Sequence, residues 1–299
     1  MPGAAPNAVA QMLGLLGDEW TLLIVQQALL GSTRYGEFAA GLPVSHAVLT
    51  NRLQTMAAEG LLTRREYQIK PARSEYLLTP QGRSLWPVLT SIWHWERTWV
   101  PDHRPPLPAM CHLDCGAEFA PAVTCRSCGA PAGADDRGER VVAQWGPSGS
   151  WQRSIPAATN RRRSAGRRVD AASLFPETMS VIGDRWAFAL LVAAFVGVGR
   201  FTDFQSQLGA PPGTIADRLA LFCGEDVLAN TGGRYALTAK GRGFFPILVC
   251  ALSWAQRWFP APEGAAVILT HRACGREFSP ALVCDRCGAR LRGAQIRPV

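Results

Sequence analysis

The sequence contains very little lysine. Lys70 and Lys240 are the only lysines, although lysine and arginine together number 31 and give a formal net charge of +8. Arginine therefore carries nearly all of the positive charge, and its planar guanidinium suits bidentate contacts with phosphate and guanine. The same bias also fits a genome rich in G and C. The basic balance favours a polyanionic partner without specifying one.

Long apolar runs and an export signal are also missing. The longest apolar run, 186–198, is shorter than the roughly 20 residues that a membrane-spanning helix needs. The N-terminal residues do not follow the charged, apolar and small-residue order of a secretory signal. We therefore expect a cytoplasmic protein without membrane contact, in which the nine cysteines bind metal or stay reduced. No nucleophile–base pair or phosphate-binding glycine loop is evident, so we do not expect an enzyme.

The sequence repeats itself. His112-x2-Cys115-x9-Cys125-x2-Cys128 recurs as His271-x2-Cys274-x9-Cys284-x2-Cys287, at an offset of 159 positions. Upstream, Gly17-Asp18-Glu19-Trp20 matches Gly183-Asp184-Arg185-Trp186 at an offset of 166, so the second unit lacks seven residues in between. A duplicated unit should fold as two similar modules. The repeat predicts a first domain at 1–102, a first cysteine module at 103–132, a linker at 133–173, a second domain at 174–261 and a second cysteine module at 262–299.

The repeated cysteine motif has the spacing of a metal site. Three thiolates and one imidazole on two short knuckles suit a tetrahedral Zn²⁺, and four protein ligands leave no open position for catalysis. Cys111 competes with His112 as a ligand, but the second unit has Thr270 there and keeps its histidine. The alternative is a pair of thiol clusters without metal. The sequence thus predicts two structural zinc sites, one in each unit, formed by His112, Cys115, Cys125 and Cys128, and by His271, Cys274, Cys284 and Cys287.

The segment before each cysteine module follows one pattern. Helical apolar spacing covers 9–30, and a short helix at 36–41, a turn and an amphipathic helix capped by Ser45 then indicate a helix-turn-helix. Two strand-like runs, 62–68 and 73–78, occupy the position of a wing. Thr79-Pro80 should open a long helix that kinks at Pro87, and Pro246 marks the matching kink in the second unit.

These motifs resemble the HxlR family of bacterial winged-helix regulators. The resemblance lies in Gly-Asp-x-Trp before an apolar helix, Arg-Tyr-x-Glu-Phe, Val-Leu-Thr-x-Arg-Leu, Glu-Gly-Leu-Leu and Glu-Tyr-x-Leu-Thr-x-x-Gly, and extends over roughly 9–100 and 176–259. It implies operator DNA as partner and dimerisation through terminal helices. The predicted fold is mainly α with small β-hairpins (α+β), with two winged helix-turn-helix domains, each followed by a zinc-ribbon-like knuckle pair, packed as an intramolecular pseudo-dimer. Further homodimerisation stays open.

The two units differ where such a fold would touch double-stranded DNA. Asn51, an adenine-type probe, is replaced by Asp217, and the formal charge of the wing falls from +3 over 63–74 to +1 over 229–234. We therefore expect the first unit to be the principal reader, the alternative being that both units bind. The candidate contacts are Arg34, Ser45, His46, Thr50, Asn51, Arg52, Gln54, Arg64, Arg65, Lys70 and Arg73 in the first unit, and Arg200, Thr214, Arg218 and Arg234 in the second.

Three features allow more than one interpretation. The arginine-rich run at 161–168 is either a solvated linker or an arm that lies along phosphates. The aromatic residues of the long helices, such as Trp95 and Trp254, either form the core and the seam between units or enclose a small apolar effector. Cys223 and Cys250 are buried structural thiols or redox sensors. The competing function is a small-molecule or redox sensor, or an interaction scaffold, that no longer binds DNA through its second unit.

Overall fold

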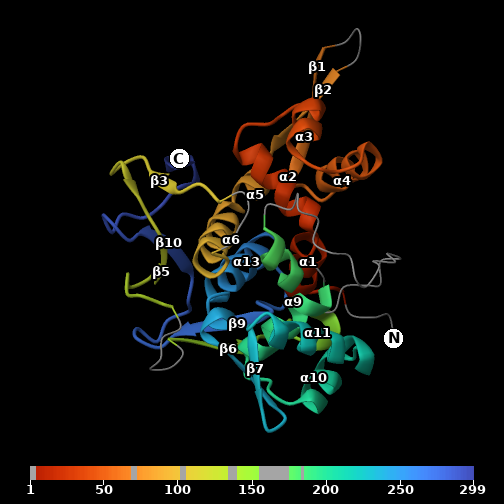
Figure 1. Cartoon of the computed structure of the whole chain (residues 1–299), viewed down its shortest axis with the longest axis vertical. Helices are drawn as coiled ribbons and strands as arrows, with labels where there is room; N and C mark the ends of the chain where they lie inside the picture. Colours follow the sequence, from red (N-terminus) through yellow and green to blue (C-terminus); the bar gives the residue numbers. More distant parts are fainter. Residues whose placement is uncertain (1–4, 69–72, 102–105, 134–139, 155–174, 183–184) are drawn as a thin grey trace.

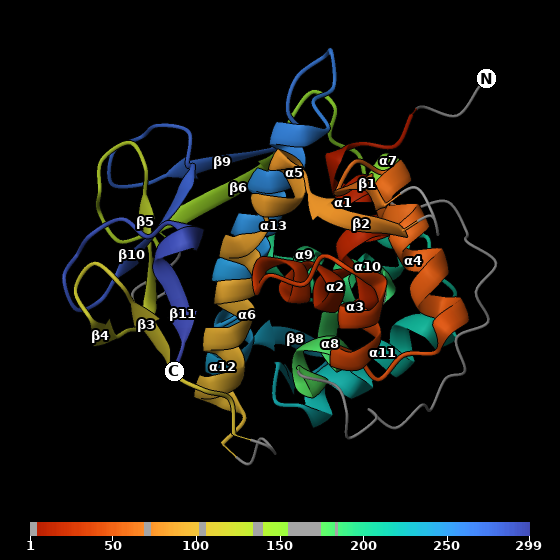
Figure 2. The same ribbon diagram turned by 90° about the horizontal axis from the view of Figure 1, so that it is seen from above.

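The protein was analysed as a computed structural model that describes residues 5–68, 73–101, 106–133, 140–154, 175–182 and 185–299. We call residues 1–132 copy one and residues 174–299 copy two. Their helix-turn-helix units lie at opposite ends of the longest axis, with the helices α6 and α13 between them and the cysteine-bearing strands along one side (Figures 1 and 2). This arrangement agrees with the predicted fold class.

Copy one has the predicted order of elements. The predicted wing strands match β1 and β2 residue by residue, and Ser45 caps the second helix of the helix-turn-helix by accepting a hydrogen bond from the Val48 N–H at 3.4 Å. The elements are α1 (Ala8–Leu16), α2 (Glu19–Leu29), α3 (Tyr35–Gly41), α4 (His46–Ala58), β1 (Leu62–Gln68), β2 (Arg73–Leu78), α5 (Pro80–Arg83), α6 (Trp86–Trp99), β3 (Met110–His112), β4 (Ala117–Glu118) and β5 (Pro121–Cys125). Strand β6 (Val141–Trp145) and helix α7 (Trp151–Ser154) follow.

Copy two repeats this order with a shorter hairpin. Gly232 and Gly233 turn it with φ of +59° and +80°, and the Asn230 side chain accepts a hydrogen bond from the Gly233 N–H, which are features of a tight two-residue turn. The seven missing residues are therefore the outer part of the wing. The elements are α8 (Pro176–Ile182), α9 (Arg185–Phe195), α10 (Phe201–Leu208), α11 (Pro212–Gly224), β7 (Leu228–Thr231), β8 (Arg234–Leu237), α12 (Ala239–Arg242), α13 (Phe245–Trp258), β9 (Val267–His271), β10 (Pro280–Cys284), the 3-10 turn Gly293–Gln295 and β11 (Ile296–Pro298).

The expectation of one long helix kinked at Pro87 is wrong. Thr79 caps α5 as predicted, but α5 ends at Arg83, and a new helix begins at Trp86 with Pro87 in its first turn. Proline lacks an N–H, so it is tolerated where a helix needs no donor and opens α6 instead of bending it. Pro246 occupies the same place in α13.

Tryptophans bind α6 and α13 together across the seam. The Trp95 Nε1–H donates to the Lys240 carbonyl oxygen at 3.2 Å, and the Trp254 Nε1–H donates to the Gln81 carbonyl oxygen at 3.1 Å. Both donors and both acceptors are related by the 159-residue offset of the repeat, so these two hydrogen bonds are pseudosymmetric. The Trp95 ring also lies 4.2 Å from the Phe244 ring, centroid to centroid. These contacts confirm, for Trp95 and Trp254, the interpretation as packing between the copies.

Strands of the two copies pair with one another. Strands β5 and β10 are antiparallel, and Val123 pairs with Leu282, its own equivalent, so a pseudo-twofold axis passes between them. On one side of the axis β6 pairs with β9, and on the other β11 pairs with β3 (Figure 2). Strand β11 of copy two thus pairs with the strand that bears His112, and β6, from the segment between the copies, pairs with the strand that bears His271.

Among the described residues, no single helix has both the length and the apolar composition to cross a bilayer. Helices α1 and α2 satisfy both criteria only when taken together, and the chain bends by 78° between them.

A buried ion pair fixes helix α4 against helix α2. Asp18 caps α2 by accepting from the Thr21 N–H at 3.3 Å, and its other carboxylate oxygen lies 2.5 Å from Arg52 Nη2. Arg52 is 8% exposed and lies on the buried face of α4 beside Leu49 and Leu53. The prediction that Arg52 contacts the DNA backbone is therefore wrong, because its guanidinium faces inward to a carboxylate.

Removing one member of this pair should destabilise the fold. We expect Arg52→Met and Asp18→Asn each to lower the free energy of unfolding by about 3–5 kcal/mol, because each breaks the buried Arg52–Asp18 ion pair. The double variant should lose less than the sum of the two, which urea unfolding of all four proteins would measure. The exposed Arg64→Ala serves as control and should change stability by less than about 0.5 kcal/mol. Strictly additive losses would show that the pair does not couple the helices.

Candidate nucleic-acid interface and metal clusters

Helix α4 presents a polar face to solvent at the far end of copy one. Its buried stripe includes Leu49, Leu53 and Met56, which pack into the core of copy one. The polar side chains expected to probe a groove lie on the other face, and all of them are exposed. They are Ser45, His46, Thr50, Asn51 and Gln54. The helix therefore has an outward face of donors and acceptors with which it could enter a major groove.

Sequence reasoning missed Tyr35 as an organiser of this face. Tyr35, the first residue of α3, lies 3.0 Å through its hydroxyl from His46 Nδ1, and its ring stacks on the imidazole at 5.9 Å between centroids. The Thr50 hydroxyl donates to the Tyr35 hydroxyl at 3.4 Å, and the latter donates to the His46 carbonyl oxygen at 3.2 Å. Half-buried Tyr35 thus holds the exposed His46 and Thr50 in one network across the helix-turn-helix. The only sequence signal was the position of Tyr35 in the Arg-Tyr-x-Glu-Phe motif.

The wing of copy one carries exposed arginines in different environments. The Arg64 Nε–H donates to the Ser74 hydroxyl, whereas Arg65 forms an ion pair with Glu75 at 2.6 Å. Arg73 is exposed at the start of β2. The remaining wing candidate, Lys70, lies outside the described residues.

Arg34 joins the wing to the helix-turn-helix. Its guanidinium carbon lies 5.0 Å from the centroid of the Tyr67 ring, a cation–π distance. Its backbone forms an isolated β-bridge with Glu75, and the Tyr76 N–H donates to the carbonyl of the neighbouring Thr33 at 2.7 Å. Arg34 is exposed, so it is available at the junction between the wing and α3.

The corresponding surface of copy two is poor in polar probes. Helix α11 begins after Pro211 without a side-chain cap, and its outward residues include Gly213, Ala216 and Asp217, all exposed. The copy-two candidates divide by exposure: Arg200 and Arg234 are exposed, whereas Thr214 and Arg218 are half-buried. The four candidates therefore do not form a polar face like that of α4.

The eight predicted metal ligands form two clusters, each of which draws on both copies. The residue types and the number of clusters agree with the prediction, but the grouping within each copy is wrong. Cys111 lies outside both clusters, as expected. Within each cluster the ligand-type atoms all lie within 4.8 Å of one another. One cluster consists of His112, Cys115, Cys284 and Cys287, and the other of Cys125, Cys128, His271 and Cys274.

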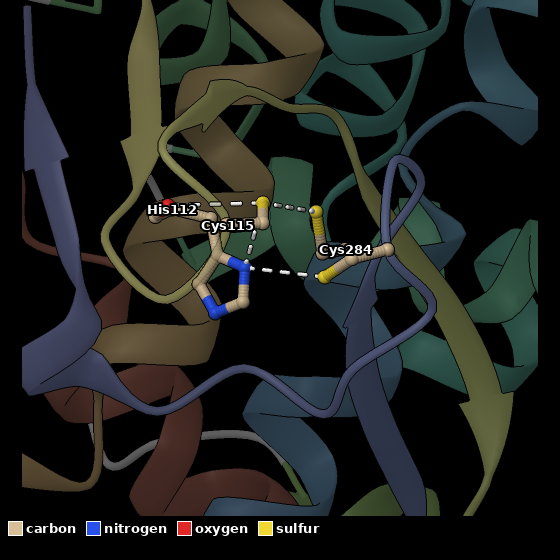
Figure 3. A group of neighbouring side chains, drawn as sticks. His112, Cys115 and Cys284 are labelled. Atoms are coloured by element: carbon tan, nitrogen blue, oxygen red, sulfur yellow. Dashed lines mark hydrogen bonds between the residues drawn. The ribbon is translucent and has the colours of Figure 1, made fainter.

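The first cluster has the geometry of a small cation site. His112 Nδ1 lies 3.4 Å from Cys115 Sγ and 3.5 Å from Cys287 Sγ, and the Cys115 and Cys284 sulfurs are 4.0 Å apart (Figure 3). A tetrahedral ion with metal–sulfur bonds of about 2.3 Å and metal–nitrogen bonds of about 2.0 Å separates its ligands by comparable distances. His112 Nε2 points away from the sulfurs and lies 3.8 Å from Asp114.

The second cluster mirrors the first. His271 Nδ1 lies 3.4 Å from both Cys274 Sγ and Cys128 Sγ, and its Nε2 lies 3.4 Å from the Pro131 carbonyl oxygen. Both histidines are fully buried, which fixes their rings. The knuckle glycines Gly129 and Gly288 have φ of +74° and +70°, so the tight turns expected at these positions are present.

The cysteines inside and outside the clusters differ in acidity. Hydrogen bonding, first from the Ala117 backbone N–H and then from neighbouring groups of the cluster, lowers the pKa of Cys115 to about 7 and favours the thiolate that binds a cation. Burial instead raises the pKa of Cys250 to about 12 and also raises that of Cys223. Cys250 and Cys223 are therefore poor nucleophiles at neutral pH, which supports their interpretation as structural thiols.

A family model matches this chain twice. The HxlR-like helix-turn-helix model covers residues 15–104 and 181–263, which is more than half of the chain. The chain belongs to the HxlR-like helix-turn-helix family. Both matched regions contain a complete helix-turn-helix and its hairpin, so the family assignment applies to each copy.

Individual relatives match one family unit. An HTH-type transcriptional regulator of Mycobacterium bovis is 34% identical over 127 residues, which are 40% of this chain and 80% of the relative. The regulator YvaP of Bacillus subtilis is 40% identical over 87 residues, 29% of this chain and 81% of the relative. The crystal structure of PA1607, described as a candidate transcription factor, is 31% identical and covers 45% of this chain and 99% of that chain, with a TM-score of 0.40.

Paired substitutions distinguish the two ways of grouping the ligands in this HxlR-like chain. Cys115→Ser with Cys287→Ser changes one cluster of the structure and should leave one metal ion per chain. Cys115→Ser with Cys128→Ser changes both clusters and should leave none, because three ligands hold a structural ion poorly. Metal content by mass spectrometry of the purified proteins gives the answer. The reverse result would mean that each copy builds its own site, and the single Cys111→Ser variant controls for loss of an unrelated thiol.

Proposed function

We propose that this protein is an HxlR-type transcriptional regulator that binds double-stranded operator DNA mainly through copy one, with copy two as its partner. The observation that carries the proposal is the difference between the outward faces of α4 and α11. Helix α4 exposes His46, Thr50 and Asn51, whereas α11 exposes glycine, alanine and an aspartate. Asparagine can pair with adenine in the major groove, while aspartate repels phosphate. The names of the mycobacterial and bacillar relatives support regulation of transcription.

Within copy one, each group of residues has a distinct role. Asn51 and Gln54 read base edges. Tyr35 holds His46 and Thr50 in position to contact bases as well. Arg64, Arg73 and Lys70 of the wing contact phosphates, and Arg34 does so from the base of the wing. Arg65 contributes less, because its ion pair with Glu75 offsets its charge. Ser45 acts as the helix cap.

The two mixed clusters bind Zn²⁺ in a structural role. Zinc suits three thiolates and an imidazole in tetrahedral geometry, and four protein ligands leave no position for a substrate. The ion would cross-link copy one to copy two on each side of the pseudo-twofold axis. The Asp114 carboxylate and the Pro131 carbonyl oxygen lie near the second nitrogen of each histidine, where such groups orient metal ligands.

The proposed role implies a cellular location. A regulator of operator DNA acts in the cytoplasm. The arginine-rich run 161–168 lies outside the described residues, and its two interpretations, linker or phosphate-binding arm, are separated by the salt dependence of binding after its deletion.

Matched substitutions in α4 and α11 test which copy reads DNA. Asn51→Ala should weaken binding to the protein's own promoter region by about 1–3 kcal/mol, the usual contribution of a bidentate base contact. Asp217→Ala, at the equivalent position of copy two, should leave affinity nearly unchanged. A DNA shift titration at fixed salt measures both. Equal losses of affinity in the two variants would contradict the proposal that copy one is the principal DNA reader. If the unmodified protein does not shift the promoter DNA, DNA binding itself is contradicted.

The wing should contribute affinity without specificity. Arg73→Gln should weaken binding to all DNA sequences and reduce the slope of log affinity against log salt by about one, since one phosphate contact is lost. Arg234→Gln in the short hairpin of copy two is the control and should leave the slope unchanged. Titrations at four salt concentrations would measure this slope, and the same change in both variants would place both hairpins on phosphate.

A further inference from the structure

Each copy contains a cavity at the same place in the fold. Around copy two it lies between α13, the end of α9, strand β8, the strands β6 and β9, and Val9 and Met12 of α1 from copy one, and its volume is about 650 Å³. In copy one the equivalent space lies between α6, the end of α2 and the strands β3 and β11, and only about 110 Å³ is left. The two sets of lining residues correspond through the repeat: Trp86, Thr90 and Trp93 in copy one are Phe245, Val249 and Leu252 in copy two.

Larger aromatic side chains account for the small cavity of copy one. Trp93 is buried, donates its Nε1–H to the Pro108 carbonyl oxygen at 3.0 Å and meets the ring of Phe175 at 5.9 Å. At the equivalent positions of the repeat, the larger pocket has Leu252 of copy two in place of Trp93, and Val9 of copy one in place of Phe175. Both substitutions remove rings from the same space, so copy two has an open chamber where copy one has a packed core.

The chamber is partly open to solvent, and its wall is mostly apolar. Apolar surface in contact with water forgoes the free energy of burial that a bound apolar ligand would supply. The volume of the chamber lies within the range of about 300–1,000 Å³ that small-molecule sites occupy. Copy two therefore has the space of a ligand site, and copy one shows that the same fold can fill it with side chains.

The lining specifies the chemistry of the ligand. Most of the wall is aliphatic or aromatic, with Phe195, Phe245 and Trp145 among its members. The charged residues of the wall are Arg140, Arg234, Arg242 and Asp203, an excess of positive charge. An apolar body would fill the chamber, and an acidic group would lie in the positive field of its arginines and pair with Arg234.

We propose that the copy-two chamber is an effector site for an apolar organic acid. Asp203 and Arg234 of its wall belong to α10 and β8, the helix-turn-helix and hairpin of copy two. A bound ligand would thus contact the recognition unit of copy two and the long helix α13 together. The effector role of the site rests on the proposed function. Ligand binding at the site does not.

Two fluorescent probes with a common ring system test the site in the full-length protein. The anionic probe is 8-anilino-1-naphthalenesulfonate, and the neutral probe is N-phenyl-1-naphthylamine. Titration should show one saturable site per chain, with the anion bound roughly fivefold more tightly than the neutral analogue because of the arginines. Equal affinity for the two probes would overturn the claim that the ligand carries an acidic group. Absence of saturable binding would overturn the claim that the chamber is a ligand site.

Variants that give the larger pocket the side chains of the smaller one locate the probe. Leu252→Trp and Val9→Phe should each weaken probe binding roughly tenfold or more by filling the chamber. Leu113→Trp, at a residue that is 43% exposed, adds the same ring outside the chamber and should change nothing. If Leu252→Trp does not fold, as judged by circular dichroism, Val9→Phe decides. Unchanged binding in folded filling variants would overturn the proposal, because the probe would then bind elsewhere.

The same titrations separate this proposal from the proposed function. Probe binding is measured without DNA, and promoter binding is measured with and without the probe. Saturable probe binding with no promoter binding would support the site and reject the regulator. Promoter binding that is insensitive to a bound probe would reject the effector role alone.

Discussion

The sharing of both histidine–cysteine clusters between the copies is the constraint on which the rest of this structure depends. Neither copy can complete a four-residue cluster from its own described residues, because His112 and Cys115 need Cys284 and Cys287, and the reverse holds on the other side. The antiparallel pairing of β5 with β10 brings these knuckles together, and Val123 opposite Leu282 sets the symmetry. In two separate chains such an arrangement would form only at sufficient protein concentration. Within one chain the second half is always present at high effective concentration, which makes the pseudo-dimer insensitive to dilution.

Fusion of the two copies also removes a restriction that applies to a homodimer. In a homodimer every substitution appears twice, so a change that harms the reading helix harms both. Here α4 keeps Asn51 while α11 has Asp217, and the wing of copy two is shortened to a two-glycine turn. The core shows the same divergence, with Trp93 in one half and Leu252 in the other. The pseudosymmetric contacts of Trp95 and Trp254 remain, because they hold the seam and serve both halves equally.

Local sequence signals predicted local structure well and long-range grouping poorly. The cap at Ser45, both wing strands and all eight cluster residues followed from spacing and residue type. The assignment of these residues to clusters did not follow from the sequence. The His-x2-Cys knuckle of one copy can form a cluster with the Cys-x2-Cys knuckle of the same copy or of the other copy, and the spacing of the motif is the same in both cases. Arg52 was assigned to DNA although it shares the helical stripe of Leu49, Leu53 and Met56. That periodicity, with Asp18 at a helix cap, was the available sign of a buried pair.

The seam offers a physical route from the chamber of copy two to the helix-turn-helix and wing of copy one. Helix α13 forms part of the chamber wall, and on its other side Trp254 donates to the Gln81 carbonyl oxygen and Trp258 donates to the Ser84 hydroxyl. Gln81 lies in α5, which follows β2 of the wing directly after the Thr79 cap. A ligand that displaced α13 would therefore act on the base of the copy-one wing through two hydrogen bonds.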